Sequence, residues 1–526
     1  MTAAEPHSSR ADSFDEEYDV IVVGYGFAGG AAAIEASDAG ARVLILEKMP
    51  DPGGISICAG GGVRIAKSFE DAFAYLRATN AGTTPDDVLE VFARGMTTLD
   101  AYVRKLATLN RAKLVTIDRE GNYPFPGYGT FQFLEVESVP GFDAVRDYPQ
   151  GRGLRRGANL FKVVQDNVDR RTIDVRLATA ALRLVTNADG EVIGVVSRNA
   201  GGQRRSKARR GVVLACGGFE ADHAMQRQYW NLSPVLPVAS RGNTGDGIRM
   251  AMQAGADLWH MWHFHGSFGF LHPDPTYPVG MRMRRLPQWT PGGKPPDVQM
   301  SWILLDKTGH RFMHECPPYM QDTGHRPLHL FDPVTQSFPY VPAYALVDEE
   351  GRKMYPLAEM ICNDRAAKYY AWSDDNLKEV ETGLLQKAES IAELASKMKV
   401  DETVLKATLD RWNAQCANGA DDDFGRLAAT MAPVKTPPFY FGEVWPIVSN
   451  TQGGPVHDAR QRVLNPFGEP IPRLFEAGEL GSIWGHLYLC GGNLSECLIT
   501  GHIAGNEVTR LAPWDASAHD HALEAV

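Results

Sequence analysis

Cysteines and long hydrophobic runs are scarce in this sequence, and their scarcity excludes several classes of protein. The seven cysteines among 526 residues form no CxxC pair, so neither a disulfide framework nor a zinc site of the common spacing is indicated. No uninterrupted apolar segment reaches the roughly 20 residues of a transmembrane helix. Residues 1–16 are polar and acidic and lack the apolar core of a signal peptide. We therefore expect a cytoplasmic protein with reduced thiols and no transmembrane segment.

The sequence also has no excess of basic residues. The chain has 64 acidic against 53 basic residues, which gives a formal net charge of -11. This balance lacks the positive footprint of a nucleic-acid-binding protein, and we expect no nucleic-acid partner. With 44% hydrophobic and 22% charged residues the composition is that of an ordinary globular protein. The length exceeds what one hydrophobic core usually holds, so two domains are expected.

No metal site is predicted. The chain has one dense group of histidines, near a predicted domain boundary, but this group lacks the neighbouring carboxylates that a catalytic metal site would need. We interpret these side chains as structural or pocket-lining: His260, His263, His265 and His272.

A glycine-rich turn near the start of the chain lies between a strand and a helix. The continuous apolar run that begins at Tyr18 and ends at Gly24 is typical of a buried parallel strand. The turn has the spacing GxGxxG, with glycines at 24, 26 and 29, and an alanine-rich helix follows to about Ala39. A second strand, from Arg42 to Glu47, completes a βαβ unit.

This unit predicts a dinucleotide-binding site. The first glycine makes the tight turn, the second lets the backbone approach a pyrophosphate, and the third permits close packing of the helix on the strand. The helix N-terminus offers free N–H groups and the positive end of its dipole to the phosphates. Glu47 follows Gly29 by eighteen residues and is placed to accept hydrogen bonds from ribose hydroxyls.

Two further segments resemble the signatures of proteins that bind FAD. Residues 47–56 resemble the second glycine cluster of such flavoproteins, and residues 475–479 resemble the late segment whose acid binds the ribitol chain. The histidine used for covalent attachment is not evident around Gly54, so non-covalent FAD is expected. The predicted cofactor-binding residues are Gly24, Gly26, Ala28, Gly29, Glu47, Lys48, Gly54, Ser56, Gly61, Ala180, Gly217, Asp246, Glu479, Asn493 and Leu494.

The rest of the chain indicates an interrupted cofactor domain. Residues 174–198 alternate like a hairpin or meander, and residues 211–218 read as another buried strand. Composition changes after about residue 275, and residues 376–432 are expected to be largely helical. We predict an α/β fold in which a Rossmann-type FAD-binding domain, a parallel sheet with a β-meander, carries an inserted α+β substrate (cap) domain. The expected ranges are 17–275 and 441–526 for the FAD-binding domain and 276–440 for the insertion.

Taken together, these segments and several further motifs resemble the superfamily of fumarate reductases and 3-ketosteroid dehydrogenases. The further motifs include Asn243-Thr-Gly-Asp-Gly, Arg311-Phe-Met-His-Glu and Thr451-Gln-Gly-Gly. Fumarate reductases carry a proton-donating arginine where this chain has Tyr319. They also carry a histidine where it has Asn450, and a late arginine where it has Tyr488 and Leu489. A dianionic substrate would then lie unpaired in an apolar site, so fumarate is a poor candidate.

The arrangement Tyr488-Leu-Cys490-Gly-Gly492 looks closest to the 3-keto-5α-steroid Δ4-dehydrogenases, with cysteine in place of serine at 490. The resemblance implies an enzyme that introduces a 4,5 double bond into a 3-keto-5α-steroid. It implies Tyr319 as the base, Tyr488 and the backbone N–H near Gly492 as the groups that hold the ketone, and Cys490 as an aid to proton transfer. The roles of Tyr319 and Tyr488 could be exchanged.

Several alternatives stay open at this point. Within the enzymes they are a 3-ketosteroid 1,2-dehydrogenase and an ene-reductase of the fumarate reductase type that acts on a conjugated enone. A non-catalytic flavin-binding or sensory protein is a rival from another class. The expected partners are a small apolar substrate of the steroid type and an electron acceptor that the sequence does not identify.

Overall fold

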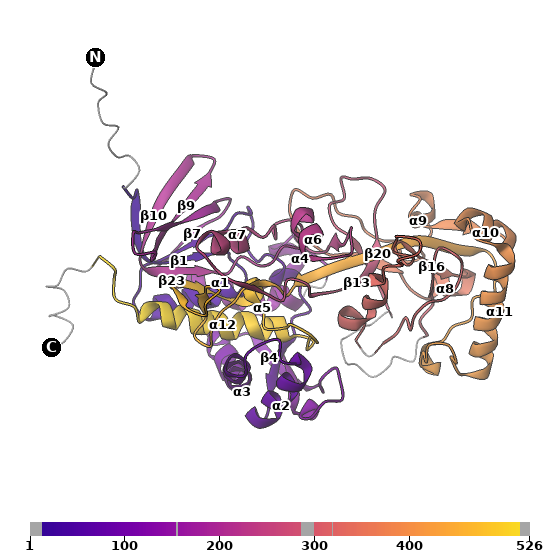
Figure 1. The fold of residues 1–526 in the computed structure, drawn as a ribbon, viewed down its shortest axis with the longest axis horizontal. Helices are drawn as coiled ribbons and strands as arrows, with labels where there is room; N and C mark the ends of the chain where they lie inside the picture. The colour runs from indigo at the N-terminus through magenta and orange to yellow at the C-terminus, as the bar shows by residue number, and fades with distance from the viewer. Residues whose placement is uncertain (1–12, 154–155, 286–298, 318, 516–526) are drawn as a thin grey trace, which may run out of the picture.

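The computed structural model describes residues 13–153, 156–285, 299–317 and 319–515. Figure 1 shows an elongated molecule with one large sheet towards each end. Strand β20 (Phe439–Thr451) runs along the long axis through the middle of the molecule.

The first sheet is mostly parallel. Its strand order is β22-β23-β10-β1-β2-β7, and the five strands from β23 to β7 are parallel to their neighbours. Strands β8 and β9 continue from β10 as an antiparallel meander. The strands are β1 (Glu16–Val23), β2 (Val43–Leu46), β7 (Ile173–Arg176), β8 (Ala180–Thr186), β9 (Val192–Asn199), β10 (Gly202–Leu214), β22 (Arg462–Leu464) and β23 (Pro470–Glu476).

Both faces of this sheet are covered, which explains why its central strands are apolar throughout. In β1, Val20 and Val22 belong to the core formed with the helices, whereas Ile21 and Val23 belong to the core formed with the meander. The helices of that first core include α1 (Phe27–Asp38), α3 (Asp86–Ala107), α5 (Arg156–Asp169) and α12 (Gly492–Thr509).

Two glycines let α12 lie directly against α1. A Cβ atom at Gly501 would lie 2.5 Å from the carbonyl oxygen of Ala28, and one at Gly505 would lie 2.4 Å from that of Ala32. Real Cβ atoms do not approach so closely, so larger residues would push the helices apart. The second half of α12 is thereby held beside the N-terminal half of α1, which follows the predicted dinucleotide turn.

The second sheet is mostly antiparallel and is built around β20. Its order is β15-β16-β20-β13-β14-β17, and β11 and β19 also pair with β20. The strands are β11 (Leu236–Pro237), β13 (Phe264–Phe270), β14 (Met281–Met283), β15 (Ile303–Leu305), β16 (Ala343–Val347), β17 (Ala358–Met360) and β19 (Gln386–Ala388). The helices of the chain between residues 349 and 418 are α8 (Glu349–Met354), α9 (Lys378–Glu381), α10 (Ile391–Met398) and α11 (Glu402–Asn418), at the right of Figure 1.

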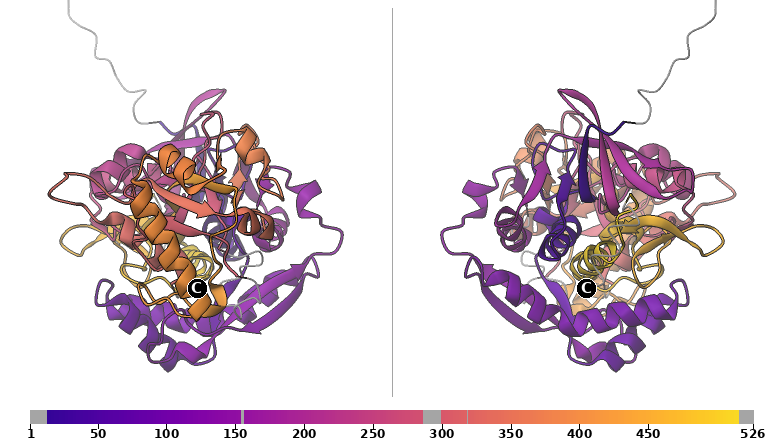
Figure 2. Two further views of the ribbon diagram at one scale, coloured as in Figure 1. Left: turned by 90° about the vertical axis from the view of Figure 1, so that its right-hand side faces the viewer. Right: turned by 90° about the vertical axis from the view of Figure 1, so that its left-hand side faces the viewer.

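A small third sheet contributes a wall to the site described below. Strand β5 (Phe131–Ser138) pairs with β3 (Val63–Ala66) on one side and β4 (Lys113–Asp118) on the other. Helices α2 (Phe69–Asn80) and α3 lie near it, and these purple elements form the lower lobe in both views of Figure 2. The remaining α-helices and strands are short: α4 (Ala144–Asp147), α6 (His223–Tyr229), α7 (Asp246–Gln253), β6 (Gly151–Arg152), β12 (Leu258–Trp259), β18 (Cys362–Asn363) and β21 (Gly454–Pro455).

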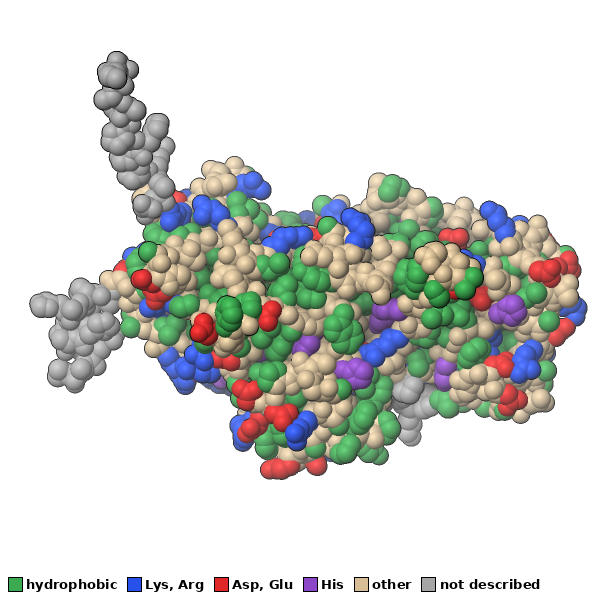
Figure 3. All heavy atoms as spheres, viewed as in Figure 1, with side chains coloured by type: hydrophobic (Ala, Val, Ile, Leu, Met, Phe, Trp, Pro, Cys, Tyr) green, Lys and Arg blue, Asp and Glu red, His purple; other side chains and the backbone are tan. Residues whose placement is uncertain are grey.

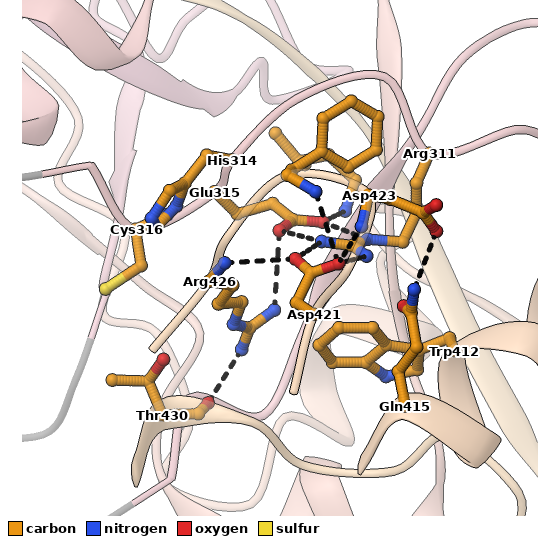
Figure 4. A network of polar contacts seen from close by, with 12 residues as sticks. Arg311, His314, Glu315, Cys316, Trp412, Gln415, Asp421, Asp423, Arg426 and Thr430 are labelled. Atoms are coloured by element: carbon orange, nitrogen blue, oxygen red, sulfur yellow. Dashed lines mark hydrogen bonds and ion pairs between the residues drawn. The ribbon is translucent and has the colours of Figure 1, made fainter. Parts of the chain in front are cut away.

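A buried polar network fixes the segment that leads to Tyr319 (Figure 4). The Arg311 guanidinium lies 2.7 Å from Glu315 and 3.0 Å from Asp421, and it covers the Trp412 ring at 4.2 Å. Arg426 donates to the carbonyl oxygens of Met300, Trp302 and Thr430. Because these charges are paired and hydrogen-bonded, their burial is tolerated. The segment Arg311–Glu315 thus connects the loop after α11 to the second sheet.

The surface carries both signs of charge. On the face shown in Figure 3, blue and red side chains are interspersed among hydrophobic and neutral ones. Within the part of the chain that the structure describes, no helix combines the length and the apolar character needed to cross a membrane.

The predicted fold class is confirmed: the chain has a mostly parallel sheet with a β-meander and a second, mixed region. The predicted βαβ unit, the strand near residue 211 and the late strand near residue 474 are all present. One local prediction was wrong in part. Residues 173–176 form β7, an outer strand of the parallel sheet, so the meander begins only at Ala180. The domain boundaries stay predictions.

Candidate active site

The glycine turn between β1 and α1 is as tight as its spacing predicts. Gly24 has a φ of +105°, and a Cβ there would lie 2.4 Å from the carbonyl oxygen of Ala215. A Cβ at Gly29 would lie 2.0 Å from the Gly24 carbonyl oxygen, so only glycine fits where the helix meets the turn. The N-cap residue of α1, Gly26, has no capping side chain, which leaves the helix end open to an anion.

A cavity lies over this turn, and we call it the glycine-lined cavity. Most of the predicted cofactor-binding residues line it: Gly24, Gly26, Ala28, Glu47, Lys48, Gly54, Ser56, Gly217, Asp246 and Glu479. Gly29 lies just behind the turn and is not part of the lining. The lining also includes Asn243, which the sequence analysis did not single out as a single residue.

Glu47 is fixed by the backbone around it. Its two carboxylate oxygens accept hydrogen bonds from the N–H groups of Tyr25 at 2.9 Å and Met49 at 2.8 Å. Burial raises the pKa of this carboxyl group. Nearby, Lys48 Nζ lies 2.6 Å from Asp246, so two predicted cofactor-binding residues form an ion pair at the rim.

One predicted cofactor-binding residue, Ala180, is not part of the lining, whereas its neighbour is. The lining of the glycine-lined cavity includes Ala181 and not Ala180. Both are in β8, where successive side chains point to opposite faces of the sheet.

A second and larger cavity, which we call the large cavity, adjoins the first. It has a volume of about 730 Å³ and shares Ile55, Ser56, Glu479 and Cys497 with the glycine-lined cavity. The predicted residues Gly61, Asn493 and Leu494 line it. Its walls are largely apolar, from Ile55, Cys58, Ile117, Phe133, Val238, Ala239, Ile361 and Leu494.

The junction of the two cavities carries polar groups that suit a bound cofactor. Glu479 is buried and accepts a hydrogen bond from the Thr451 N–H at 2.9 Å. Burial and the neighbouring Glu220 raise its pKa well above the usual range. Both polar atoms of the Asn493 amide are buried without a partner among the described residues. Buried amides normally have partners, so these atoms fit a polar ligand such as a flavin.

The three side chains predicted to be catalytic meet in the large cavity. Tyr319, Tyr488 and Cys490 all line it and are almost fully buried. The two tyrosine rings are stacked with centroids 6.1 Å apart, and the Tyr319 hydroxyl donates a long hydrogen bond to Gln321 at 3.4 Å. The Tyr488 hydroxyl accepts the backbone N–H of Asn493 at 3.2 Å. Residues that are 169 positions apart in sequence thus share one wall.

The fourth predicted catalytic group is not available in the predicted way. The Gly492 N–H donates to the carbonyl oxygen of Leu489 at 2.7 Å, and Gly492 is not among the lining residues. The reason is the tight turn that opens α12, with Gly491 at a φ of +78°. Closing this turn uses the N–H that was expected to hold a ketone.

His265 is a site residue that the sequence analysis interpreted only as structural or pocket-lining. Its Nε2 atom lies 2.9 Å from the Tyr319 hydroxyl, and its ring lies 4.3 Å from that of Tyr488 between centroids. Burial lowers its pKa to about 4, so the ring is neutral. Strand alternation in β13, where Phe264 and Phe268 pack into the core, could have indicated that His265 faces the other side.

Arg64 is a second residue that the sequence analysis missed. Its side chain is 1% exposed, and it donates to the carbonyl oxygens of Cys490, Arg119 and Glu120. It also covers the Phe133 ring at 4.1 Å. Arg64 therefore holds the Cys490 backbone to the small third sheet. No sequence signal connects residues 426 positions apart.

A buried carboxylate orders the turn on the other side of the tyrosines. Asp322 accepts the Tyr488 N–H at 2.9 Å and the Tyr123 hydroxyl at 2.6 Å. His263 and Arg326 each lie 3.3 Å from its second oxygen. Although burial opposes ionisation, the hydrogen bond and charge of His263 hold the pKa of Asp322 well below its usual range. Because the Asp322 N–H also donates to the carbonyl oxygen of Tyr319 at 3.1 Å, this aspartate connects the backbones of both tyrosines.

Burial decides the protonation of the catalytic candidates. It raises the pKa of both Tyr319 and Tyr488 well above the usual range for tyrosine. It also raises the pKa of the Cys490 thiol, against the opposing effect of the Arg64 charge. All three groups are therefore protonated in this structure, and the site holds two neutral phenols, a thiol and a neutral imidazole.

Comparison with known proteins identifies the family. Residues 19–494 match the model of the family described as the FAD binding domain, and the chain belongs to that family. FAD, held non-covalently, is accordingly its cofactor, in agreement with the glycine turn and the unpartnered Asn493 amide.

Curated relatives resemble the chain over nearly its whole length. Digoxin reductase from Eggerthella lenta is 28% identical over 95% of this chain and 88% of its own. A 3-oxosteroid 1-dehydrogenase from Mycolicibacterium smegmatis is 26% identical over 94% of this chain and 98% of its own. A cytochrome-type fumarate reductase from Shewanella frigidimarina is 25% identical over 96% and 80%. The chain is an FAD-dependent oxidoreductase whose relatives include 3-oxosteroid dehydrogenases and fumarate reductases.

Solved structures share the fold. The 3-ketosteroid Δ1-dehydrogenase of Sterolibacterium denitrificans has a TM-score of 0.77 at 23% identity, and covers 94% of this chain and all of its own. The 3-ketosteroid Δ4-(5α)-dehydrogenase of Rhodococcus jostii has a TM-score of 0.65 at 22% identity, over 95% and 98% of the two chains.

Proposed function

We propose that this chain is a 3-ketosteroid dehydrogenase that introduces a double bond between carbons 4 and 5 of a 3-keto-5α-steroid. One observation carries the proposal: Tyr319, Tyr488 and Cys490 meet in an apolar cavity that adjoins the glycine-lined cavity. Dehydrogenation beside a ketone needs a base for the α-proton and a donor for the ketone oxygen. These side chains offer both groups within a cavity that suits a flat apolar molecule.

Tyr319 is the proposed base. The α-proton of the substrate passes to the Tyr319 oxygen while the phenol proton passes to Nε2 of His265, which lies 2.9 Å away. One C–H bond breaks, the O–H bond is renewed and an N–H bond forms. The neutral imidazole has a nitrogen free to accept the proton, and Cys490, which lines the same cavity, aids transfer to solvent.

Tyr488 is the proposed donor to the ketone oxygen. Its own oxygen accepts the Asn493 N–H, so its hydroxyl proton is free to donate into the cavity. The Gly492 N–H is bonded to Leu489, which leaves Tyr488 as the donor of the predicted pair. FAD supplies the hydride acceptor when it is bound, and we propose that Asn493 and Glu479 help to hold it at the junction of the cavities.

A second candidate is reduction of a conjugated enone, the reverse chemistry. The observation that favours it is the protonation state of Tyr319. Burial raises the pKa of this tyrosine and keeps it protonated, and an ene-reductase needs a protonated group to donate to the enone. The 28% identity to a digoxin reductase agrees with this direction. The same side chains would serve, because a group that takes a proton in one direction returns it in the other.

An anaerobic experiment separates these candidates. The purified yellow protein is mixed with a saturated 3-keto-5α-steroid, and flavin absorbance is followed near 450 nm. We expect rapid bleaching and a 4-ene-3-keto product on chromatography. A 1-ene product would assign a 1,2-dehydrogenase instead. If saturated ketosteroids leave the flavin oxidised and an enone reoxidises reduced enzyme, the ene-reductase is correct. Failure of every substrate with a dye acceptor would favour a non-catalytic flavin protein.

A further inference from the structure

The large cavity is lined by three arginines, and only two of them have a carboxylate partner. Arg156 is paired with Glu135, and Arg282 is paired with Glu359 at 2.9 Å. The guanidinium of the third, Arg119, has neither an ion pair nor a hydrogen bond within the described ranges. Because this side chain is only half-buried, its guanidinium stays partly hydrated and is free to pair with an anion that enters the cavity.

The surroundings of Arg119 show why it has no partner within the chain. It follows directly on β4, its side chain is half-buried, and its Nε atom is enclosed without an acceptor. Its guanidinium lies 5.8 Å from the centroid of the Phe133 ring, on the same apolar wall as Ile117. The carboxylate on that wall, Glu135, is held by Arg156. Burial lowers the pKa of Arg119, as expected of a cation without full compensation.

We propose that Arg119 binds a carboxylate carried by the substrate, so that the preferred substrate is an amphipathic 3-keto monoacid. This inference rests on the proposed function and narrows its substrate class. The apolar body of the molecule lies along Ile117 and Phe133, and its keto ring lies at Tyr319 and Tyr488.

A matched pair of substrates tests the proposal. The probes are 3-oxo-5α-cholan-24-oic acid and its methyl ester, which share the keto ring and differ in one charge. We expect the wild-type kcat/KM for the acid to exceed that for the ester by tenfold or more. Arg119→Gln should bring this ratio close to one by lowering kcat/KM for the acid, while kcat/KM for the ester changes less than twofold. Arg119→Lys keeps the charge and should retain part of the preference.

Binding is measured separately from turnover. The product acid, 3-oxo-4-cholen-24-oic acid, is titrated into oxidised holoenzyme, and its Kd is read from the change in the flavin spectrum. The Kd should rise at least tenfold in Arg119→Gln, and in the wild type it should rise with salt. Lys113→Gln is the control for net charge: this exposed, ion-paired residue lies six positions earlier, about 20 Å along the strand, and should leave the ratio unchanged.

Two outcomes would overturn the inference. If wild type turns over acid and ester equally well, the carboxylate is not recognised, although the dehydrogenase proposal stands. If Arg119→Gln lowers the values for acid and ester by the same factor, Arg119 acts on the shared keto ring. Failure of both probes in every variant, with no turnover at all, would instead count against the proposed function.

Discussion

At the scale of single residues, the site depends on how two phenols are held. The Tyr319 hydroxyl lies 2.9 Å from His265 Nε2, and the Tyr488 hydroxyl receives the Asn493 N–H. Burial removes both hydroxyls from water and raises their pKa. A tyrosine base in such a place needs a nearby group to take its proton, and His265 is the neutral acceptor within reach. The two residues therefore form one functional unit.

The first prediction concerns Tyr319. Tyr319→Phe keeps the ring stacking but removes the hydroxyl that exchanges protons, so kcat should fall by about 10²- to 10⁴-fold. The flavin spectrum and the melting temperature should stay close to those of the wild type. Turnover with a dye acceptor and anaerobic flavin bleaching measure the effect.

The matched control is Tyr344→Phe. Tyr344 lies in the second sheet and donates a long hydrogen bond to the Met398 carbonyl at 3.3 Å. This variant should keep turnover within about twofold, because its hydroxyl does not line the large cavity. Equal activity of Tyr319→Phe and wild type would remove Tyr319 from the mechanism and leave Tyr488 as the exchanged candidate.

At the scale of elements, the turn from β1 to α1 decides whether the cofactor binds. Gly29→Ala would bring a Cβ to within 2.0 Å of the Gly24 carbonyl, so the turn must open and the helix N-terminus must move. We expect the purified variant to have lost most of its FAD, measured as the ratio of absorbance at 450 and 280 nm. Gly129→Ala is the control, because a Cβ there meets nothing within 4 Å, and it should retain FAD. Full FAD content in Gly29→Ala would contradict the role of the turn.

Helix α12 carries a buried acid whose effect on stability depends on pH. Glu496 accepts hydrogen bonds from Ile483 N–H and Ser482, and burial raises its pKa from 4.5 to about 8. The folded state therefore binds a proton that the unfolded state has lost above pH 4.5. Its stabilising contribution is complete below pH 4.5 and is lost as the pH rises to 8.

Glu496→Gln should remove this dependence. Gln cannot ionise and fills the same space, so its advantage over the wild type in free energy of unfolding should grow between pH 5 and pH 8, by roughly 4 kcal/mol at most. The difference in melting temperature between variant and wild type, measured at pH 5, 6.5 and 8, reports this trend. Glu507→Gln on the same helix, where the carboxylate pairs with Arg460 and Arg510, serves as the control. A difference that is constant with pH would contradict the buried acid.

At the scale of the whole molecule, local patterns could be predicted and distant contacts could not. The strand, the three glycines and Glu47 lie within thirty residues, so spacing alone was sufficient for the dinucleotide turn. His265 and Arg64 reach the site through contacts that depend on how the second and third sheets dock. The bond from the Gly492 N–H to Leu489 was equally out of reach, because the sequence shows a helix start but not which carbonyl closes the turn before it.

Because the cofactor-binding residues come from distant parts of the chain, bound FAD should stabilise the whole fold. Residues that line the two cavities come from positions 23 to 497, and they belong to both large hydrophobic cores. A ligand that binds only the folded chain stabilises it by RT ln(1 + [L]/Kd), about 4 kcal/mol at a thousandfold excess over Kd. Removing FAD should therefore lower the melting temperature of the whole molecule by several degrees, measured by scanning fluorimetry.

Fragments of FAD show which cavity contributes to this stabilisation. FAD added back to the apoprotein should restore the melting temperature in full. ADP should restore only part, because it fills the glycine-lined cavity and leaves Asn493 without a partner. Riboflavin should be weaker still, since it gains nothing from the helix N-terminus that receives the phosphates. If ADP alone matched FAD, the large cavity would not contribute to flavin binding, and the proposed meeting of flavin and substrate at Tyr319 would lose its basis.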